Sequence, residues 1–315
     1  MANLFVSNFT NVTNTFPSNH STTVEGEMRN IPREVSYVIA IIINTIACPF
    51  TVLLNALVIM AVKRRPRLQT NSNIFLACLA TTDVLTGLVA QPLFITWKCF
   101  YLLHMETRVL DASQNLSMRA FAVCSYLHLM LVTCERLIAI KFTVHYEYIV
   151  TKQNMKLSVM AIWAFTLILT AVGLMTETVI TAARLFAAVT VTLCVLFIAI
   201  SYVILYRETR RHEEKIKVQQ LPQEEVERIV KESKALRTSV LITSAVTLSF
   251  LPAGLTVLVV SIFKIPDVMY VVAPFVRTFV MLNSLLNPLI YCLRQREMRK
   301  FVFKLPCQPV EPLNV

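Results

Sequence analysis

The sequence Asn287-Pro288-Leu289-Ile290-Tyr291 lies near the end of a long apolar stretch, and the basic run RQREMRK (294–300) follows it. A proline inside a helix removes one backbone hydrogen bond and kinks the chain. In lipid, such a defect persists only where neighbouring helices or waters satisfy the freed carbonyl group. Asn287 beside the proline and Tyr291 one turn later can supply such contacts. The stretch therefore predicts a hinge in a membrane-spanning helix.

The charged residues of the chain are clustered so that they leave seven long apolar stretches between them. Of the 315 residues, 56% are hydrophobic and 16% are charged, whereas about a quarter of a soluble domain is charged. An apolar stretch of about 20 residues is long enough to span a bilayer. Most of these stretches are apolar on all sides, unlike the amphipathic helices of soluble proteins. The sequence predicts an all-α bundle of seven transmembrane helices, at 34–63, 67–98, 119–135, 156–177, 184–207, 237–264 and 267–294.

Lysine and arginine are concentrated after the first, third and fifth stretches and in the C-terminal tail. Because basic loops stay in the cytoplasm, we expect the N-terminus outside the cell and the C-terminus inside. The formal net charge of +11 then arises from basic residues that face the anionic lipids of the inner leaflet. It does not indicate a nucleic-acid partner. We expect a multi-pass plasma-membrane protein with an extracellular tail (1–33), a membrane domain (34–293), an amphipathic helix (294–305) and a cytoplasmic tail (306–315).

Short motifs predict covalent modification of both tails. The N-terminal tail carries Asn-X-Ser/Thr triplets at Asn8, Asn11 and Asn19, which are glycosylation acceptors on the lumenal side. No cleavable signal sequence is evident, so we expect the first span to act as its own insertion signal. Cys307 follows a basic amphipathic segment that is expected to lie on the inner leaflet, and it is a candidate for palmitoylation.

The motifs along the chain resemble those of the rhodopsin-like (class A) G-protein-coupled receptors over roughly residues 34–305. The matching residues are Asn55, Asp83, Arg136, Trp163, Pro252 and Asn287-Pro288-x-x-Tyr291. The resemblance implies a receptor that binds an extracellular ligand and activates a heterotrimeric G protein through an outward shift of the sixth helix. It implies no enzymatic activity and no resident cofactor.

The resemblance also implies a switch at the cytoplasmic end. Glu135-Arg136-Leu137 stands where the family carries Asp/Glu-Arg-Tyr, and Glu232 stands where many relatives place the acidic partner of that arginine. An Arg136–Glu232 pair would hold the sixth helix in place. An exposed ion pair contributes only about 0–1 kcal/mol. The pair would therefore shift the equilibrium between two positions of the sixth helix without fixing that helix in one of them. Alternatively, both residues are solvated interface charges.

Helices five and six carry further parts of the implied switch. Tyr202 matches the helix-five tyrosine that pairs with Tyr291 in active relatives. Pro252 keeps the kink of helix six, and Phe250 replaces the usual tryptophan, so a ligand pressing on Phe250 could rotate the inner half of that helix. The third inner loop, about 207–236, is expected to extend helices five and six into the cytoplasm.

A polar group in mid-membrane surrounds Asp83. An ionised aspartate at a helix centre costs about 2.5–3.5 kcal/mol on insertion scales, so its presence is informative. The resemblance matches Asp83 to an aspartate that holds a sodium ion in similar receptors. Carboxylate, hydroxyl and amide oxygens suit a hard cation, and a water cluster that only holds the helices together is the alternative. The predicted sodium site consists of Asp83, Ser125, Asn283 and Asn287, with Asn55 and Ser284 in the same polar set.

Three arginines, Arg119, Arg184 and Arg277, are expected at the depth of the outer leaflet. Guanidinium groups around an apolar pocket would suit a carboxylate or phosphate head on a hydrophobic body. The alternative is that some of them reach the lipid headgroups or pair with nearby acids such as Asp111. The ligand could thus be a small molecule, a lipid or a peptide, with an anionic lipid or acidic-ended peptide favoured. The predicted ligand-binding residues are Met118, Arg119, Arg184, Phe250, Arg277 and Met281.

Several features of most class A receptors are missing. Asp111 stands where most have the helix-three cysteine of the outer disulfide, and the second outer loop, expected at 177–183, contains no cysteine. Met118 replaces the ammonium-binding aspartate of amine receptors, which disfavours a biogenic amine, and Met281 replaces the Schiff-base lysine of opsins. These departures resemble the melanocortin, cannabinoid, lysophospholipid and adenosine receptor cluster.

A membrane transporter or channel without G-protein coupling is the alternative function. A secondary transporter would show inverted repeats and paired broken helices, and seven spans with one Asn-Pro hinge do not divide into halves. No filter loop or polar stripe indicates a channel. The few histidines show no metal-ligand spacing, so no enzyme site is predicted.

Overall fold

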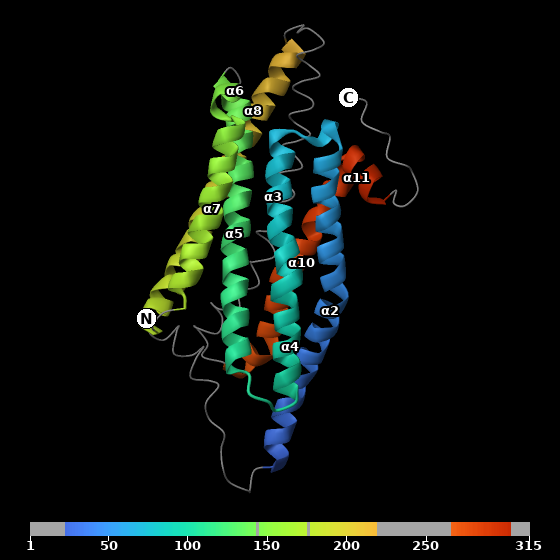
Figure 1. Cartoon of the computed structure of the whole chain (residues 1–315), viewed down its shortest axis with the longest axis vertical. Coiled ribbons are helices and arrows are strands. Elements are labelled where there is room, and N and C mark those ends of the chain that lie inside the picture. The colour runs from blue at the N-terminus through green and yellow to red at the C-terminus, as the bar shows by residue number, and fades with distance from the viewer. Residues whose placement is uncertain (1–22, 143–144, 175–176, 219–265, 304–315) are drawn as a thin grey trace.

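The structure is a computed structural model that describes residues 23–142, 145–174, 177–218 and 266–303. This part of the chain consists of helices, and the longest of them lie side by side along the vertical axis of Figure 1. The helices are α2 (Thr23–Arg64), η2 (Pro66–Leu68), α3 (Asn71–Leu85), η3 (Thr86–Ala90), α4 (Gln91–Leu102), α5 (Arg108–Lys141), α6 (Tyr146–Ile149), α7 (Lys152–Val172), α8 (Glu177–Val218), α10 (Pro266–Arg294) and α11 (Arg296–Phe303).

Six helical segments in the described residues are long and apolar enough to cross a membrane, which confirms the predicted all-α transmembrane class. They match six of the seven predicted stretches. The predicted sixth span at 237–264, with Phe250 and Pro252, lies outside the described residues, as do Glu232, Cys307 and the three glycosylation triplets. The six segments are Pro32–Arg64, Asn71–Leu102, Arg108–Lys141, Lys152–Val172, Val189–Glu208 and Tyr270–Cys292.

The structure corrects the predicted second outer loop. Residues 177–183 form the first turns of α8, and α7 ends at Val172, immediately before Gly173. The segment 177–183 contains neither glycine nor proline, so nothing in it interrupts a helix. At its other end α8 continues to Val218, which confirms the expected extension of helix five beyond the membrane span.

Other boundaries also differ from the sequence prediction, and the third span, predicted at 119–135, lies within the longer helix α5 at Arg108–Lys141. Helix α2 begins at Thr23, inside the segment 1–33 that was predicted as a tail. The second span does not end at Lys98, because α4 continues to Leu102 and Lys98 is buried within it. The charge of Lys98 therefore does not mark the end of the span, because the residues around it accommodate the charge.

The two ends of the bundle are named here by the predicted orientation. The inner end carries α6 and α11, and the outer end is where α4 passes into α5 (Figure 1). At the inner end, threonines start two of the helices. The hydroxyl oxygen of Thr70 accepts a hydrogen bond from the Asn73 amide, and that of Thr151 accepts one from the Asn154 amide. Such caps satisfy amides that have no partner within the helix.

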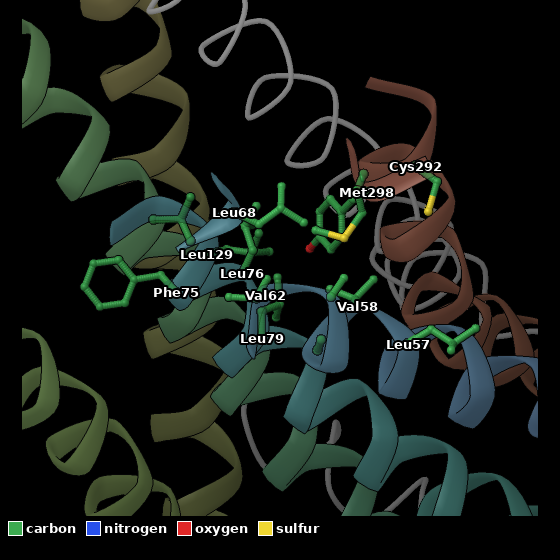
Figure 2. Packing of buried hydrophobic residues seen from close by; sticks show 14 of the residues in the cluster. Leu57, Val58, Val62, Leu68, Phe75, Leu76, Leu79, Leu129, Cys292 and Met298 are labelled. Atoms are coloured by element: carbon green, nitrogen blue, oxygen red, sulfur yellow. The ribbon is translucent and has the colours of Figure 1, made fainter. Parts of the chain in front are cut away.

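The largest buried apolar cluster lies in the inner half of the bundle and joins α2, α3, α5, α8 and α10 to α11. Figure 2 shows Met298 of α11 among the aliphatic side chains of α2 and η2, including Val58 and Leu68. Met298 and Val302 are buried, whereas Arg299 and Lys300 of the same helix are exposed. The predicted amphipathic helix is thus present at Arg296–Phe303, with one face packed against the bundle.

A second, smaller apolar cluster lies toward the outer end and contains Ala40, Ala90, Phe94, Trp97 and Met281. The mid-membrane polar residues lie between the two clusters. The described part of the chain contains no disulfide, and Cys99 near the outer end is a free thiol. The outer half is therefore held by packing and polar contacts.

Candidate functional site

The hinge at Pro288 is stabilised by a residue of another helix. Because a helical amide bonds to the carbonyl four residues earlier, Pro288 leaves the carbonyl of Ser284 without its usual donor. The Nδ2 atom of Asn55 on α2 donates a hydrogen bond to that oxygen at 2.9 Å, and another to the carbonyl of Thr51 at 2.9 Å. The sequence had assigned this role to Asn287 and Tyr291. The structure corrects this for the Ser284 carbonyl, and Asn55 makes the contact.

Asn287 instead contacts the buried carboxylate. Its Nδ2 atom donates a hydrogen bond to Oδ2 of Asp83 at 2.9 Å, and both residues are almost fully buried. The Asn287–Asp83 bond joins α10 to α3 one residue before the kink, and the Asn55–Ser284 bond joins α10 to α2 one turn earlier. The hinge of α10 is therefore connected to two neighbouring helices by side-chain hydrogen bonds.

A cavity of about 30 Å³ lies beside Asp83. A water molecule needs roughly 10–15 Å³ by the same kind of measure, so the space suits water or a small ion and is far too small for an organic ligand. All four residues of the predicted sodium site line it, together with Ser284, Met118 and Met281. The sequence-predicted residues of α3, α5 and α10 are therefore brought together.

The oxygens around this cavity fit a hard cation. The Oδ1 atom of Asn287 is buried and has no hydrogen-bond partner among the described residues, while the Asp83 carboxylate accepts from Nδ2 of the same asparagine. No group of three or more His, Cys, Asp or Glu side chains in the described ranges could hold a metal ion. A cation here would thus depend on one carboxylate with amide and hydroxyl oxygens, a set that suits a hard cation.

Glu135 at the inner end is buried, with 3% of its side chain exposed, and accepts hydrogen bonds from two other elements. Ser72 of α3 donates to its Oε2 atom, and Tyr146 of α6 donates to Oε1 at 2.7 Å. Asn71 of α3 in turn donates to the Tyr146 hydroxyl at 3.2 Å. Burial, together with the hydrogen bond to Glu135, raises the pKa of Tyr146 to about 12. The phenol therefore stays protonated, as a donor must.

Arg136 lies beside this network, with its Nε atom 3.1 Å from Oε2 of Glu135. The carboxylate thus binds the neighbouring arginine and two hydroxyl groups at once. The sequence did not identify Tyr146 or Ser72, because nothing in their spacing relates them to Glu135. The predicted partner Glu232 lies outside the described residues, so its pairing with Arg136 stays a prediction.

The two tyrosines of the implied switch occupy the same core region. Tyr291 is fully buried in the inner apolar cluster, and Tyr202 packs against that cluster. The hydroxyl oxygen of Tyr291 has no hydrogen-bond partner among the described residues. The Tyr202–Tyr291 pairing expected of the active state is therefore not formed in this conformation.

Two of the predicted ligand-binding arginines, Arg119 and Arg277, have different surroundings in the described residues. Arg119 lines a separate space of about 20 Å³ between α5 and α7. Arg277 of α10 has its Nη1 atom 4.0 Å from Oδ1 of Asp111 and its guanidinium carbon 4.7 Å from the centre of the Trp97 ring. Arg119 and Arg277 thus have different neighbours in the described residues, and their joint contact with a ligand stays a prediction. The side chain of Arg184 and all of Phe250 lie outside the described part.

Two further cations, Lys98 and Arg33, join Arg277 at the outer end. Lys98 is 4% exposed, and its Nζ atom lies 3.5 Å from the ring centre of Trp97 and 3.9 Å from that of Tyr37. Contacts of this kind contribute about 2 kcal/mol when they are shielded from water, which offsets part of the cost of burying the charge. The sequence analysis treated Lys98 and Arg33 only as basic charges on the outer side. The adjacent aromatic residue Trp97 was a signal that Lys98 could be buried against a ring.

A family model described as the seven-transmembrane receptor of the rhodopsin family matches residues 54–184 and 176–291. The chain belongs to this family. The membership confirms the resemblance to class A receptors, and the motifs at Asp83, Arg136 and Pro288 all fall inside the matched ranges. The six candidate spans and the hinge of α10 are the corresponding structural features.

Curated relatives of this rhodopsin-family protein include adenosine and serotonin receptors. The adenosine receptor A3 of Bos taurus is 28% identical over 109 residues, which cover 35% of this chain and 33% of that receptor. The 5-hydroxytryptamine receptor 2B of Mus musculus is 28% identical over 145 residues, with 46% and 29% covered. The 5-hydroxytryptamine receptor 1E of Pan troglodytes is 26% identical over 152 residues, with 46% and 40% covered. The chain thus spans less than half the length of each of these relatives.

Proposed function

We propose that this protein is a plasma-membrane receptor that binds an extracellular ligand and activates a heterotrimeric G protein. The observation that carries the proposal is the hydrogen-bonded hinge of α10. Asp83 and Asn55 hold it from two helices, at 2.9 Å each. A helix that is kinked at a fixed point and joined to its neighbours by a few buried polar bonds can adopt two discrete arrangements, as a switch requires.

The mechanism is a shift between populations of two states. In the described conformation Glu135 holds Arg136, and the Tyr291 hydroxyl has no hydrogen-bond partner among the described residues. Ligand binding at the outer end favours a second state, in which the bonds around Asp83 rearrange and Tyr291 approaches Tyr202. Helix six then moves outward, and Arg136 becomes available to the G protein. The N-terminus is outside the cell and the C-terminus inside, in accord with the basic inner loops.

The test is guanine-nucleotide exchange. Membranes from cells that express the full chain should accelerate binding of a non-hydrolysable GTP analogue to at least one member of a panel of purified G proteins, compared with membranes that lack it. A panel of ligands weighted toward carboxylates and phosphates should then enhance the rate. Ion currents or solute uptake without any exchange activity would instead support the transporter or channel alternative.

The ligand is proposed to be anionic, whether a lipid, a peptide with an acidic end or a small molecule. Arg277 at the outer end supports this, because one of its guanidinium nitrogens is buried without a hydrogen-bond partner among the described residues. Met118 and Met281 line the small cavity beside Asp83, which is too small to hold the ligand itself. The relatives named for 5-hydroxytryptamine do not extend that ligand to this chain, since Met118 stands where amine receptors carry their aspartate.

The proposed sodium site predicts a specific effect of salt. Replacing choline chloride by sodium chloride at equal ionic strength should raise the melting temperature of the purified protein. At a sodium concentration of ten dissociation constants the gain is about 1.4 kcal/mol. Asp83→Asn should abolish this response, because the neutral amide removes the charge that holds the cation, whereas Glu147→Gln at the exposed inner surface should keep it. An equal sodium response in wild type and Asp83→Asn would favour the water cluster.

The network around Glu135 predicts a more active variant. Tyr146→Phe removes the 2.7 Å hydrogen bond to the carboxylate and should raise ligand-independent nucleotide exchange. Hydrogen bonds to charged groups contribute about 1.5–3 kcal/mol, and partial exposure reduces this, so an increase of roughly three- to tenfold is expected. Tyr148→Phe is the matched control, because Tyr148 lies on the same short helix and is 84% exposed. Equal basal exchange in both variants would contradict a restraining role for Tyr146.

A further inference from the structure

Three cations from three different helices are linked through shared aromatic neighbours at the outer end. Arg33 of α2 and Lys98 of α4 both contact the rings of Tyr37 and Tyr101. Lys98 and Arg277 of α10 both contact the ring of Trp97. We call Arg33, Lys98 and Arg277 the outer cation cluster. The positive charges repel one another, so packing alone does not explain why they converge.

The outer cation cluster is poor in negative charge. Asp111 is the carboxylate within ion-pair distance of it in the described residues, and it reaches only Arg277, at 4.0 Å. One oxygen of Asp111 also accepts a hydrogen bond from Asn115 at 2.9 Å, which divides its interaction between two partners. Within the described residues, three positive charges thus face one shared negative charge.

The donors of the cluster are also poorly satisfied. The side chain of Lys98 makes no hydrogen bond or ion pair within the described part of the chain, although the residue is only 4% exposed. The Nη1 atom of Arg277 is buried without a hydrogen-bond partner there. Aromatic faces attract a cation, but they do not replace the acceptor oxygens that its N–H groups lose on burial. Among the described residues, the buried Nη1 atom of Arg277 therefore lacks an acceptor, and the contacts of the Lys98 ammonium group are with aromatic rings.

We propose that the outer cation cluster binds the carboxylate, phosphate or sulfonate head group of an amphiphilic anion. Lys98 and Arg277 bind the head group, Arg33 adds charge, and the rings of Tyr37, Trp97 and Tyr101 contact the apolar body. Asp111 is the resident counter-ion, and the anion replaces it beside Arg277. This deepens the proposed function by naming the anion-binding residues of the ligand site, two of which, Arg33 and Lys98, were not among the sequence-predicted set.

The chain contains a natural reporter for this site. It has two tryptophans; Trp97 contacts Lys98 and Arg277, whereas Trp163 lies against His128, with 6.1 Å between ring centres. Trp163→Phe therefore leaves one tryptophan, and its fluorescence reports on the cation cluster. The measurement uses the full chain in phosphatidylcholine nanodiscs and needs no G protein, so its outcome is independent of whether nucleotide exchange is detected.

Octanoate is the probe, and octanol and octylammonium, with the same tail and a neutral or positive head, are its controls. Octanoate should change the Trp97 emission saturably, and the two controls should not. Lys98→Gln and Arg277→Gln should each weaken apparent octanoate affinity by about tenfold, because each removes a charged donor. Arg108→Gln, an exposed cation at the same end of the bundle, should leave it unchanged. A response shared by octanol and octanoate, or no saturable response to octanoate, would overturn the proposal.

Asp111→Asn provides a test of opposite sign, which holds even if a cation variant fails to fold. Removing the resident counter-ion should tighten octanoate binding by several-fold, and unchanged or weaker binding would contradict its displacement. Nanodiscs that contain phosphatidylglycerol distinguish between a lipid head group and a free anion as the natural ligand. Loss of the octanoate response in these discs assigns the cluster to an anionic lipid head group, and an equal response assigns it to a free anion.

Discussion

Arg136→Ala is expected to reduce nucleotide exchange on the G protein by at least about tenfold, because a charge-assisted hydrogen bond contributes about 1.5–3 kcal/mol and each 1.4 kcal/mol is tenfold. In the described conformation the guanidinium is 18% exposed and held by Glu135 at 3.1 Å. The proposed active state releases it toward the G protein. The measurement is binding of a non-hydrolysable GTP analogue at matched amounts of receptor in the membrane.

The matched control for this variant is Arg67→Ala, which removes an exposed arginine at the same end of the bundle. If the inner end acted only through its total positive charge, both variants would lower exchange equally. Arg136→Lys is informative as well, since a lysine keeps the charge but lacks the planar fork that contacts Glu135 through Nε. Full exchange activity in Arg136→Ala would refute the assigned role.

Met298→Ala is expected to destabilise the folded protein by about 2–5 kcal/mol, the usual cost of truncating a buried methionine. Met298 is fully buried where α11 meets the inner apolar cluster (Figure 2). The side chain joins α11 to α2 and η2, so its loss leaves a cavity and loosens the helix. The effect is measured as a change in the melting temperature of the purified protein without ligand. Unfolding is followed with a thiol-reactive fluorescent dye or by light scattering.

Phe303→Ala is the control, because Phe303 lies on the same helix, is larger than Met298 and is 59% exposed. Its truncation should change the melting temperature in detergent only slightly. It should instead weaken contact of α11 with the bilayer, if the predicted position on the inner leaflet is correct. A larger loss of stability in Phe303→Ala than in Met298→Ala would contradict the observed packing of α11.

Local sequence rules predicted the position of the spans well and the partners of polar residues poorly. The carbonyl freed by Pro288 receives its hydrogen bond from Asn55, which is 229 positions away from Ser284 in the sequence. Reasoning from the neighbourhood of the proline could only suggest Asn287 and Tyr291. The partner depends on how α2 and α10 pack, which no local pattern specifies.

The arginines at the outer end show that the sequence predicted the direction of side chains poorly. Arg119 directly follows Met118, and consecutive residues of a helix point about 100° apart; Met118 lines the cavity beside Asp83, whereas Arg119 lines the space between α5 and α7. The position of a residue along a helix predicts its depth in the bundle, whereas the direction of its side chain also depends on how the helix packs. Lys98 is a different example. Its charge was expected to mark the end of a span, but its side chain is buried against aromatic rings.

The sequence by itself determined the class of the protein, the approximate positions of six spans and the residues of the mid-membrane polar group. It could do so because the cost of placing charge in lipid is a local property of each stretch, and the motifs stand at characteristic separations. Only the tertiary structure decided which groups meet: Asn55 with the Ser284 carbonyl, Tyr146 with Glu135, and Lys98 with Trp97 and Arg277. These contacts depend on the rotation and packing of whole helices, which many distant side chains determine together.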